Sequence, residues 1–316
     1  MKTVSFLALE AFSYQLEPVI SLLRSDYCHQ VEFIPQSDLN ESLDRFSLNT
    51  DLIVTVHSIG DGLSEFLNMA RNSGVLSLTI QDGIIEHCHA WLKPHSRNFY
   101  RPILTDKIAV MGSFSRDILI AWGAEPNSIA ITGLPRLDYL PEIPAPFGDS
   151  LLLTCANTPF YDDDTKMHFK QFMMHLINEL ENRHIDYVAR LPKSVYELLE
   201  YRIPKESFSD SSDRRSLRED LGRSSAVLTT MSTVALEAMA CHRPTAIINP
   251  ENMTQYFHTP WTISSTDQAS TVISELLSVP AEKMIFQNYV LSQHLRIDNS
   301  STDRVCQLIN TMLLES

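Results

Sequence analysis

Residues 226–248 have the sequence AVLTTMSTVALEAMACHRPTAII. The stretch begins with a short apolar run, passes through hydroxyl-bearing residues, and continues into a segment with helical spacing that ends near Ala240. A second apolar run, 245–248, follows a proline. Strand, helix and strand in this order predict a βαβ unit with parallel strands.

The same alternation covers most of the chain. Further apolar runs typical of strands lie at residues 4–9, 31–35, 52–56, 75–80, 107–111, 128–132, 150–155 and 187–191. Helical patterns lie at residues 16–24, 63–71, 115–122, 164–182, 194–201, 266–277 and 303–314, and the polar residues 203–216 predict a loop. Repeated alternation of this kind predicts parallel sheets covered by helices on both faces.

A proline-rich break divides the alternation into two halves. Residues 139–149, YLPEIPAPFGD, contain three prolines and a glycine, which favour extended chain and predict a linker. We therefore expect two doubly wound domains, 1–140 and 141–316, with a final helix able to cross back. Ligands of such sheets bind at the carboxyl ends of the strands, so the domains are expected to face each other across a cleft.

Composition excludes several classes of protein. The net charge of −14 over 316 residues disfavours nucleic-acid binding, which requires a basic surface. The five cysteines are scattered and lack the paired spacing of zinc ligands, so we expect neither disulfides nor a metal site. No apolar run reaches the roughly 20 residues that span a bilayer. A cytoplasmic protein is expected; peripheral association with the inner face of the membrane or with a synthase complex stays open.

The first candidate site is the hydroxyl-rich turn before the helix Thr233–Ala240. Ser232 and Thr233 lie where free backbone N–H groups and the helix dipole favour an anion. Glu237 lies one turn further on, where a carboxylate can accept hydrogen bonds from sugar hydroxyls. The alternative is an ordinary capped helix with Glu237 on its solvent face.

Two further segments follow strands of the first half. In residues 78–86, LTIQDGIIE, Asp82 ends a strand before a glycine, a suitable place for a general base or for an ordinary turn aspartate. In residues 131–138, ITGLPRLD, a tight turn carries Arg136, which could meet an anion or pair with Asp138. The alternative is that this turn serves only as a domain hinge.

Other polar residues are weaker candidates. Arg190 and Lys193 follow the strand at 187–191 and would suit a diphosphate, or form a solvated pair. His57, Glu86 and His87 are candidates for the acceptor side of the site. The incomplete glycine motif near residue 60 does not support a dinucleotide site. The acidic run 162–164 precedes a helix and is best explained as its N-terminal cap.

Three of these segments resemble a known family in the same order along the chain. Residues 132–138, TGLPRLD, resemble the TGxPRxD turn of many GT-B enzymes, including teichoic-acid polymerases and sugar-nucleotide 2-epimerases. Residues 232–239, STVALEAM, are similar to their donor-domain segment S[ST]xxxEA. Residues 81–83, QDG, resemble a segment of transferases of bacterial surface glycans such as capsule, O-antigen and Kdo polymers.

The resemblance implies a GT-B glycosyltransferase that uses no cofactor and no metal. Asp82 would act as the base, and Arg136, Arg190, Lys193, Ser232, Thr233 and Glu237 would bind the sugar donor. The donor would be a nucleotide sugar or phosphoribosyl diphosphate, and the acceptor a glycan or a lipid-linked glycan. This chain departs from the family at residues 191–193, Leu-Pro-Lys, where many relatives have a His-Pro pair.

Three other functions remain open at this point. The first is a sugar-nucleotide 2-epimerase or hydrolase, for which His57, Glu86 and His87 could supply the additional groups. The second is a transferase that uses phosphoribosyl diphosphate, which the cations Arg190 and Lys193 make reasonable. The third is a non-catalytic GT-B module that binds glycan, against which Asp82 and the segment 232–237 argue.

Overall fold

A computed structural model describes residues 2–8, 12–25, 29–35, 49–57, 62–85, 100–144, 150–157, 159, 162–250 and 255–315. The chain divides into two compact units. Unit 1 comprises Met1–Tyr139 together with Ser292–Ser316, and unit 2 comprises Leu140–Leu291. The break falls at the start of the proline-rich segment. Residues 292–316, which include the last helix, cluster with unit 1.

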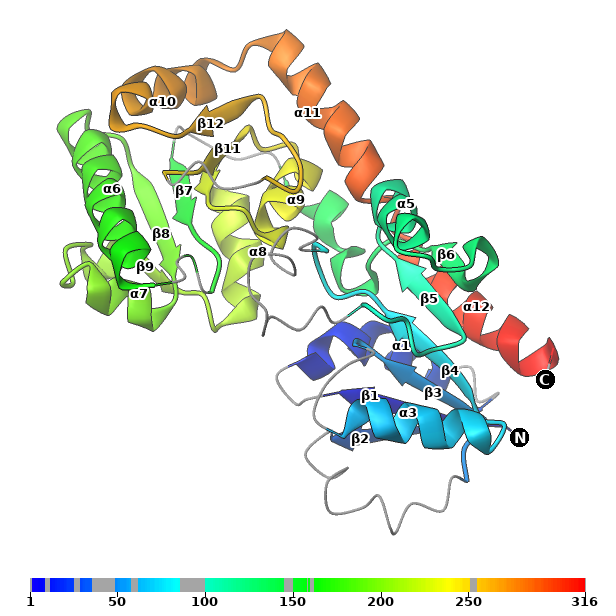
Figure 1. The fold of residues 1–316 in the computed structure, drawn as a ribbon. Helices are drawn as coiled ribbons and strands as arrows, with labels where there is room; N and C mark the ends of the chain where they lie inside the picture. The colour runs from blue at the N-terminus through cyan, green and yellow to red at the C-terminus, as the bar shows by residue number, and fades with distance from the viewer. Residues whose placement is uncertain are drawn as a thin grey trace. The chain divides into compact units, whose positions relative to one another are not determined.

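Unit 1 is built on a six-stranded sheet in the order β2-β1-β3-β4-β5-β6, with all neighbours parallel (Figure 1). The strands are β1 (Lys2–Ala8), β2 (His29–Pro35), β3 (Leu52–Thr55), β4 (Leu76–Ile80), β5 (Lys107–Val110) and β6 (Ile129–Ile131). Each agrees with an expected apolar run to within two residues at either end.

Helices cover both faces of this sheet. They are α1 (Ser13–Ser25), α3 (Leu63–Asn72), α5 (Ser113–Ala121) and α12 (Ser301–Glu315). Successive strand residues point to opposite faces. In β1, Phe6 therefore packs with α1 and α12, whereas Leu7 packs with α3. The C-terminal helix thus completes the core of unit 1.

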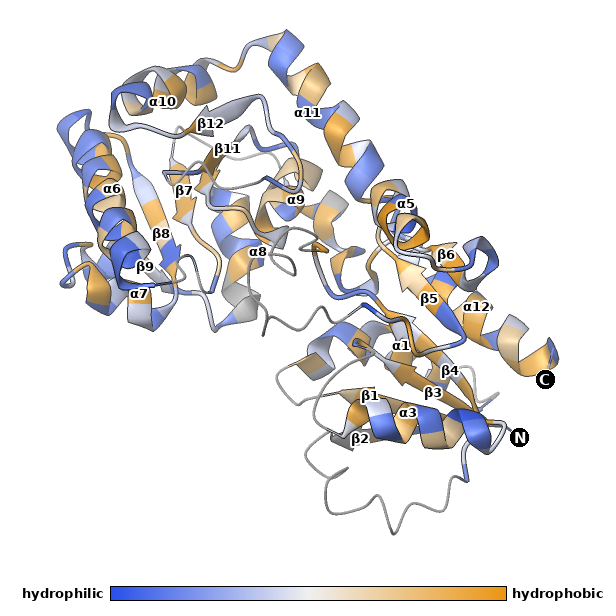
Figure 2. Cartoon of the chain, viewed as in Figure 1, coloured by the Kyte–Doolittle hydropathy of each residue, from blue (hydrophilic) through white to orange (hydrophobic). Residues whose placement is uncertain are grey.

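Unit 2 has its own six-stranded parallel sheet, in the order β12-β11-β10-β7-β8-β9. The strands are β7 (Leu151–Thr154), β8 (Tyr187–Leu191), β9 (Phe208–Asp210), β10 (Ala226–Thr229), β11 (Thr245–Ile248) and β12 (Trp261–Ile263). The helices are α6 (Asp163–Asn182), α7 (Lys193–Leu198), α8 (Arg214–Arg223), α9 (Thr233–Ala240), α10 (Ala269–Ser278) and α11 (Ala281–His294). Apart from β9, the strands are apolar along much of their length, as expected of strands buried on both faces (Figure 2).

The strand orders define one topological switch point in each sheet. In unit 1 the chain passes from β1 to β2 on one side and then to β3 on the other side of β1. In unit 2 it runs through β7, β8 and β9 and then returns to β10 on the other side of β7. Ligands of open α/β sheets bind beyond the carboxyl ends of the strands at such points.

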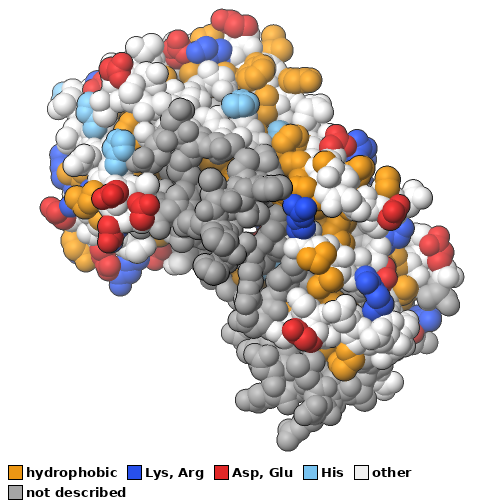
Figure 3. Space-filling model, viewed as in Figure 1, with side chains coloured by type: hydrophobic (Ala, Val, Ile, Leu, Met, Phe, Trp, Pro, Cys, Tyr) orange, Lys and Arg blue, Asp and Glu red, His pale blue; other side chains and the backbone are white. Residues whose placement is uncertain are grey.

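Four elements were not expected from the sequence. Strand β9 and the start of α8 lie within the residues expected to be a loop, and β12 and α11 were also missed. Helix α11 lacks a clear polar face because Ile285, Phe286 and Tyr289 are exposed, and Figure 3 shows apolar side chains over this helix. The acidic run was interpreted correctly: Asp162 accepts the backbone N–H of Thr165 at 2.8 Å and caps α6.

None of the helices in the described part of the chain combines the length and the apolar content that a bilayer crossing requires.

Candidate functional site

Two of the expected site residues meet at the carboxyl end of the unit 1 sheet. His57 follows β3 and Asp82 follows β4, its neighbour in the sheet. His57 Nε2 lies 3.3 Å from Asp82 Oδ2. The Asp82 side chain is 24% exposed and the His57 side chain only 7%. Asp82 can therefore reach a ligand, whereas His57 lies behind it, with the ring of Phe12 in edge-on contact at 5.1 Å.

Tyr100 completes the surroundings of Asp82. Its hydroxyl donates a hydrogen bond to Asp82 Oδ1 at 2.5 Å and accepts one from the Asp82 backbone N–H at 3.0 Å. Tyr100 is buried and its ring lies 6.4 Å from that of His57. The sequence pattern around Asp82 did not indicate Tyr100, because Tyr100 lies 18 positions after Asp82 in the sequence.

The charge of Asp82 follows from these contacts. Burial acts to raise the pKa of Asp82, but the hydrogen bonds from His57 and Tyr100 and the charges of His57 and Arg136 outweigh it and hold the pKa below its ordinary value. Burial and the adjacent Asp82 carboxylate raise the pKa of Tyr100 well above its ordinary value. At neutral pH the pair is therefore a carboxylate held by a neutral phenol.

Arg136 also contributes to this part of unit 1. The residue lies in a short 3-10 helix, η4 (Pro135–Leu137), and its Nη2 donates to the backbone carbonyl of Asp82 at 3.1 Å. Its Nε donates to Gln15 Oε1 at 3.2 Å, and its guanidinium lies 6.0 Å from the ring centre of Tyr14. The side chain thus links the turn after β6 to the segment after β4 and to α1.

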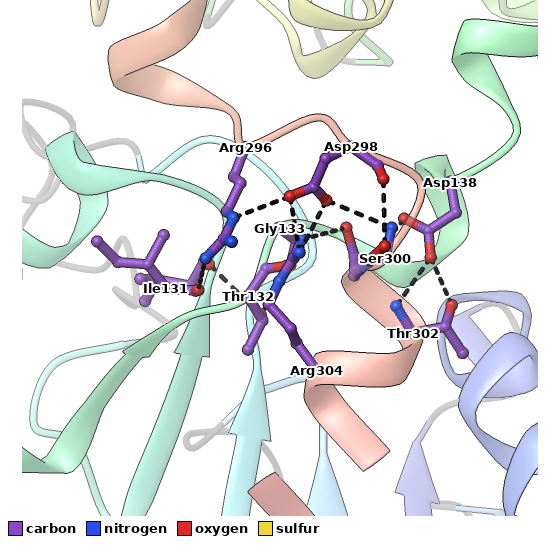
Figure 4. Close-up of polar contacts among 11 residues, drawn as sticks. Ile131, Thr132, Gly133, Asp138, Arg296, Asp298, Ser300, Thr302 and Arg304 are labelled. Atoms are coloured by element: carbon purple, nitrogen blue, oxygen red, sulfur yellow. Dashed lines mark hydrogen bonds and ion pairs between the residues drawn. The ribbon is translucent and has the colours of Figure 1, made fainter. Parts of the chain in front are cut away.

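The rest of the TGLPRLD turn holds the C-terminal helix (Figure 4). Asp138 accepts hydrogen bonds from the backbone N–H groups of Ser301 and Thr302, at 3.0 and 2.8 Å, at the start of α12. Arg304 Nε donates to the carbonyl of Thr132 at 2.8 Å. Asp138 is thus engaged by α12, not by Arg136, the pairing that the sequence left open.

Gly133 permits this close approach. It has φ +81°, and a Cβ atom there would lie 2.3 Å from Ser301 Oγ and 2.7 Å from the carbonyl oxygen of Arg296. Any other residue would combine backbone strain with a steric clash.

The second set of expected residues lies at the switch point of the unit 2 sheet. Thr230 follows β10, and its Oγ1 accepts a hydrogen bond from the backbone N–H of Ala156, just after β7, at 2.7 Å. Ser232 occupies the N-cap position of α9 in extended conformation. Its side chain makes no capping hydrogen bond among the described residues and lies 3.4 Å from Thr229 Oγ1. Ser232 therefore does not cap α9 through its side chain, as the alternative of an ordinary capped helix would require.

Glu237 lies inside unit 2. Its side chain belongs to the buried set of α9 and is 2% exposed, so it is not on the solvent face considered as the alternative. It lies one turn after Thr233, close to the helix start.

Arg190 and Lys193 differ sharply in exposure. Arg190 is 3% exposed and forms an ion pair with Asp220 at 3.3 Å. Its Nη2 also donates to the carbonyls of Ser211 and Asp213, at 3.1 and 2.8 Å. The guanidinium thus joins β8 to the segment after β9 and to α8, and would have to break these bonds to reach a sugar donor. Lys193 is exposed at the start of α7.

Glu86 and His87, the other acceptor-side candidates, lie outside the described residues.

The sequence matches no protein-family model and no curated protein. Solved structures do share its fold. MnaA from S. aureus, solved in a co-structure with UDP, is 13% identical, with 99% of this chain and 97% of that chain covered, and a TM-score of 0.71. The UDP-GlcNAc 2-epimerase of Methanocaldococcus jannaschii, in complex with UDP-GlcNAc and UDP, is 12% identical over 98% and 100%, with a TM-score of 0.70.

A third similar structure is a variant of the wall teichoic acid polymerase TagF. It is 14% identical, with 99% of this chain and 90% of that chain covered, and a TM-score of 0.68. At such low identity the likeness shows the fold alone. Together with the two parallel six-stranded sheets, it shows that this chain has the GT-B fold.

Proposed function

We propose that this protein is a glycosyltransferase that moves a sugar from a nucleotide-sugar donor to a hydroxyl group of a growing bacterial surface glycan. The observation that carries the proposal is the ionised, partly exposed carboxylate of Asp82 beyond the carboxyl end of β4. A fixed carboxylate at the ligand-binding edge of such a sheet is suited to accept a proton from an acceptor hydroxyl.

The proposed reaction balances without a cofactor. The acceptor oxygen forms a bond to the anomeric carbon, the bond from that carbon to the phosphate oxygen breaks, and the nucleotide diphosphate leaves. The acceptor hydroxyl loses its proton to Asp82. Because the pKa of Asp82 is low, we expect this transfer late in the step, when the hydroxyl has become acidic through its bond to the sugar.

Unit 2 supplies the proposed site for the sugar donor. Ser232 and Thr233 lie at the start of α9, beside the bridge that Thr230 makes at the switch point. A diphosphate there would accept backbone N–H bonds and meet the positive end of the helix dipole. Lys193 is placed on the exposed surface after β8 and adds a positive charge. We assign Arg190 a structural role instead, because its bonds join β8 to the segment after β9 and to α8.

The surface-glycan assignment rests on the motif resemblance together with the fold shared with a wall teichoic acid polymerase. Because the QDG segment resembles that of bacterial surface-glycan transferases, including Kdo transferases, we favour a capsule or O-antigen as the product.

A UDP-GlcNAc 2-epimerase is the second candidate. It is favoured by the fold that this chain shares with a UDP-GlcNAc 2-epimerase, at a TM-score of 0.70. The two functions differ in one requirement: epimerisation needs no acceptor, whereas transfer does.

One experiment separates them. The purified protein is first screened by thermal shift against UDP, CMP and phosphoribosyl diphosphate, since a ligand of the native state raises the melting temperature. The matching sugar donor is then incubated with and without oligosaccharide acceptors. Acceptor-dependent release of the leaving group (UDP, CMP or pyrophosphate, according to the donor) supports transfer, and a 2-epimer formed without acceptor supports epimerisation. Glycan binding with no turnover of any donor would contradict both enzymatic functions and would indicate a non-catalytic glycan-binding module.

A further inference from the structure

We propose that Tyr100 is a positioning residue that holds Asp82 by its Oδ1 oxygen and leaves Oδ2 as the oxygen that takes the proton of the acceptor hydroxyl. This inference rests on the proposed function, in which Asp82 is the base. It adds a residue that no motif contains and assigns the reaction to one oxygen of the carboxylate.

The hydrogen bonds of Tyr100 form a closed ring with Asp82. The phenol oxygen accepts the Asp82 backbone N–H at 3.0 Å and donates its own proton to Oδ1 at 2.5 Å. Because both contacts go to the same residue, they fix the side chain relative to its own backbone. Arg136 adds a bond to the Asp82 carbonyl at 3.1 Å, which fixes the backbone in turn.

The two carboxylate oxygens are consequently unequal. Oδ1 takes part in a short hydrogen bond, whereas Oδ2 lies 3.3 Å from His57 Nε2, near the long limit for such a bond. Because each carboxylate oxygen has two lone pairs, this long contact leaves Oδ2 room to accept the proton of the acceptor hydroxyl. Among the described residues, the titratable or charged groups that act on Asp82 are His57 after β3, Tyr100 before β5 and Arg136 in η4.

Tyr100 remains a hydrogen-bond donor over the whole working range of pH. Burial and the Asp82 charge raise the pKa of Tyr100 well above its ordinary value, so its proton is not lost. The phenol therefore stabilises the ionised form of Asp82 without competing for the transferred proton.

The variant Tyr100→Phe tests this role, because it removes the hydroxyl and keeps the ring. With one stabilising hydrogen bond lost, we expect the pKa of Asp82 to rise and the acid limb of the kcat/KM profile to move to higher pH. We expect kcat to fall by about 10- to 100-fold, the effect of one hydrogen bond to a charged group, with KM for the sugar donor unchanged.

Tyr196→Phe is the matched control. Tyr196 is a buried tyrosine of unit 2 whose hydroxyl donates to the carbonyl of Ile203 at 3.1 Å. Loss of the Tyr196 hydroxyl should lower the free energy of unfolding about as much as Tyr100→Phe does, without moving the acid limb of the kcat/KM profile. A second variant carries a fluorinated tyrosine at position 100, a stronger hydrogen-bond donor of nearly the same shape. It should shift the pKa of Asp82 in the opposite direction, downwards.

The carboxyl resonance of Asp82, followed by carbon-13 NMR and assigned by its absence in Asp82→Asn, gives a readout that needs no substrate. An unchanged titration of Asp82 in Tyr100→Phe overturns the inference, whether or not the protein is a transferase. A shifted titration in a protein that transfers no sugar refutes the proposed function but not the contact. If Tyr100→Phe shifts the titration yet keeps the wild-type kcat in an active transferase, the positioning role is overturned.

Discussion

Asp138 and Thr302, 164 residues apart in the sequence, are joined by two hydrogen bonds: the Asp138 carboxylate accepts the backbone N–H of Thr302 at 2.8 Å and its hydroxyl at 2.7 Å. Figure 4 shows this contact beside Gly133. A side chain from the turn after β6 thus caps a helix from the end of the chain.

Asp138→Ala should therefore destabilise unit 1. Removal of an N-terminal cap costs about 1–2 kcal/mol, and the free energy of unfolding, measured with a chemical denaturant, should fall by that amount. Asp138→Asn keeps an acceptor oxygen and should lose less. Equal losses in the two variants would contradict the capping role.

Gly133→Ala should destabilise more than Gly74→Ala. Both glycines have positive φ, +81° and +76°, but nothing lies within 4 Å of a Cβ atom at Gly74 among the described residues, whereas Ser301 Oγ would lie at 2.3 Å at Gly133. The Gly74 variant should lose about 1–2 kcal/mol, the conformational cost alone, and the Gly133 variant more. The difference measures how closely the C-terminal segment approaches the turn; equal values would mean that the segment moves away freely.

Arg190→Met should be far more damaging than Lys193→Met. The first leaves Asp220 buried without its positive partner, at a cost of about 3–5 kcal/mol. The second removes an exposed charge and should change the unfolding free energy by less than about 0.5 kcal/mol. Only Lys193→Met is expected to fold normally and bind the sugar donor more weakly. A stable Arg190→Met variant with impaired binding of the sugar donor would instead indicate that Arg190 contacts the donor.

Ser232→Ala should weaken binding of the sugar donor without loss of stability. Because the Ser232 side chain makes no capping bond to α9 among the described residues, its removal costs the helix little. Loss of one hydrogen bond to a phosphate should raise Kd by about 10-fold, and the double variant with Thr233→Ala should raise it further. Isothermal titration with the ligand found by thermal shift measures this. An unchanged Kd with a lowered melting temperature would instead indicate a helix cap.

Asp82→Asn tests the proposed base directly. Asparagine has nearly the same shape and its amide oxygen can still accept the Tyr100 hydroxyl, so fold and affinity for the sugar donor should be kept. Turnover should fall by about 10²- to 10⁴-fold, the usual contribution of general-base catalysis. Asp138→Asn serves as the control, since that residue binds α12 and should leave turnover nearly unchanged. If Asp82→Asn keeps near-normal turnover, the carboxylate serves only the turn.

Local pattern was sufficient for most of the strands and helices. The apolar runs 187–191, 226–229 and 245–248 coincide with β8, β10 and β11, and the helix Thr233–Ala240 begins and ends where it was expected. Such elements are encoded in their own residues, because apolar side chains must recur with the period of a strand or a helix to reach a core. Strand β9 was missed for the same reason: it has a single apolar residue, Phe208, and pairs with the one neighbour β8 in a region held by Arg190.

The sequence by itself thus determined the class of fold and the position of Asp82 at the end of a strand. Only the tertiary structure decided that Tyr100 and His57 hold Asp82, that Arg190 is occupied by Asp220, and that α12 completes unit 1. The physical reason is the separation along the chain of the residues that interact. Periodicity indicates which face of an element is buried. The partner of a polar side chain depends instead on strand order and on how distant segments pack together, and the residues next to it in the sequence do not encode either.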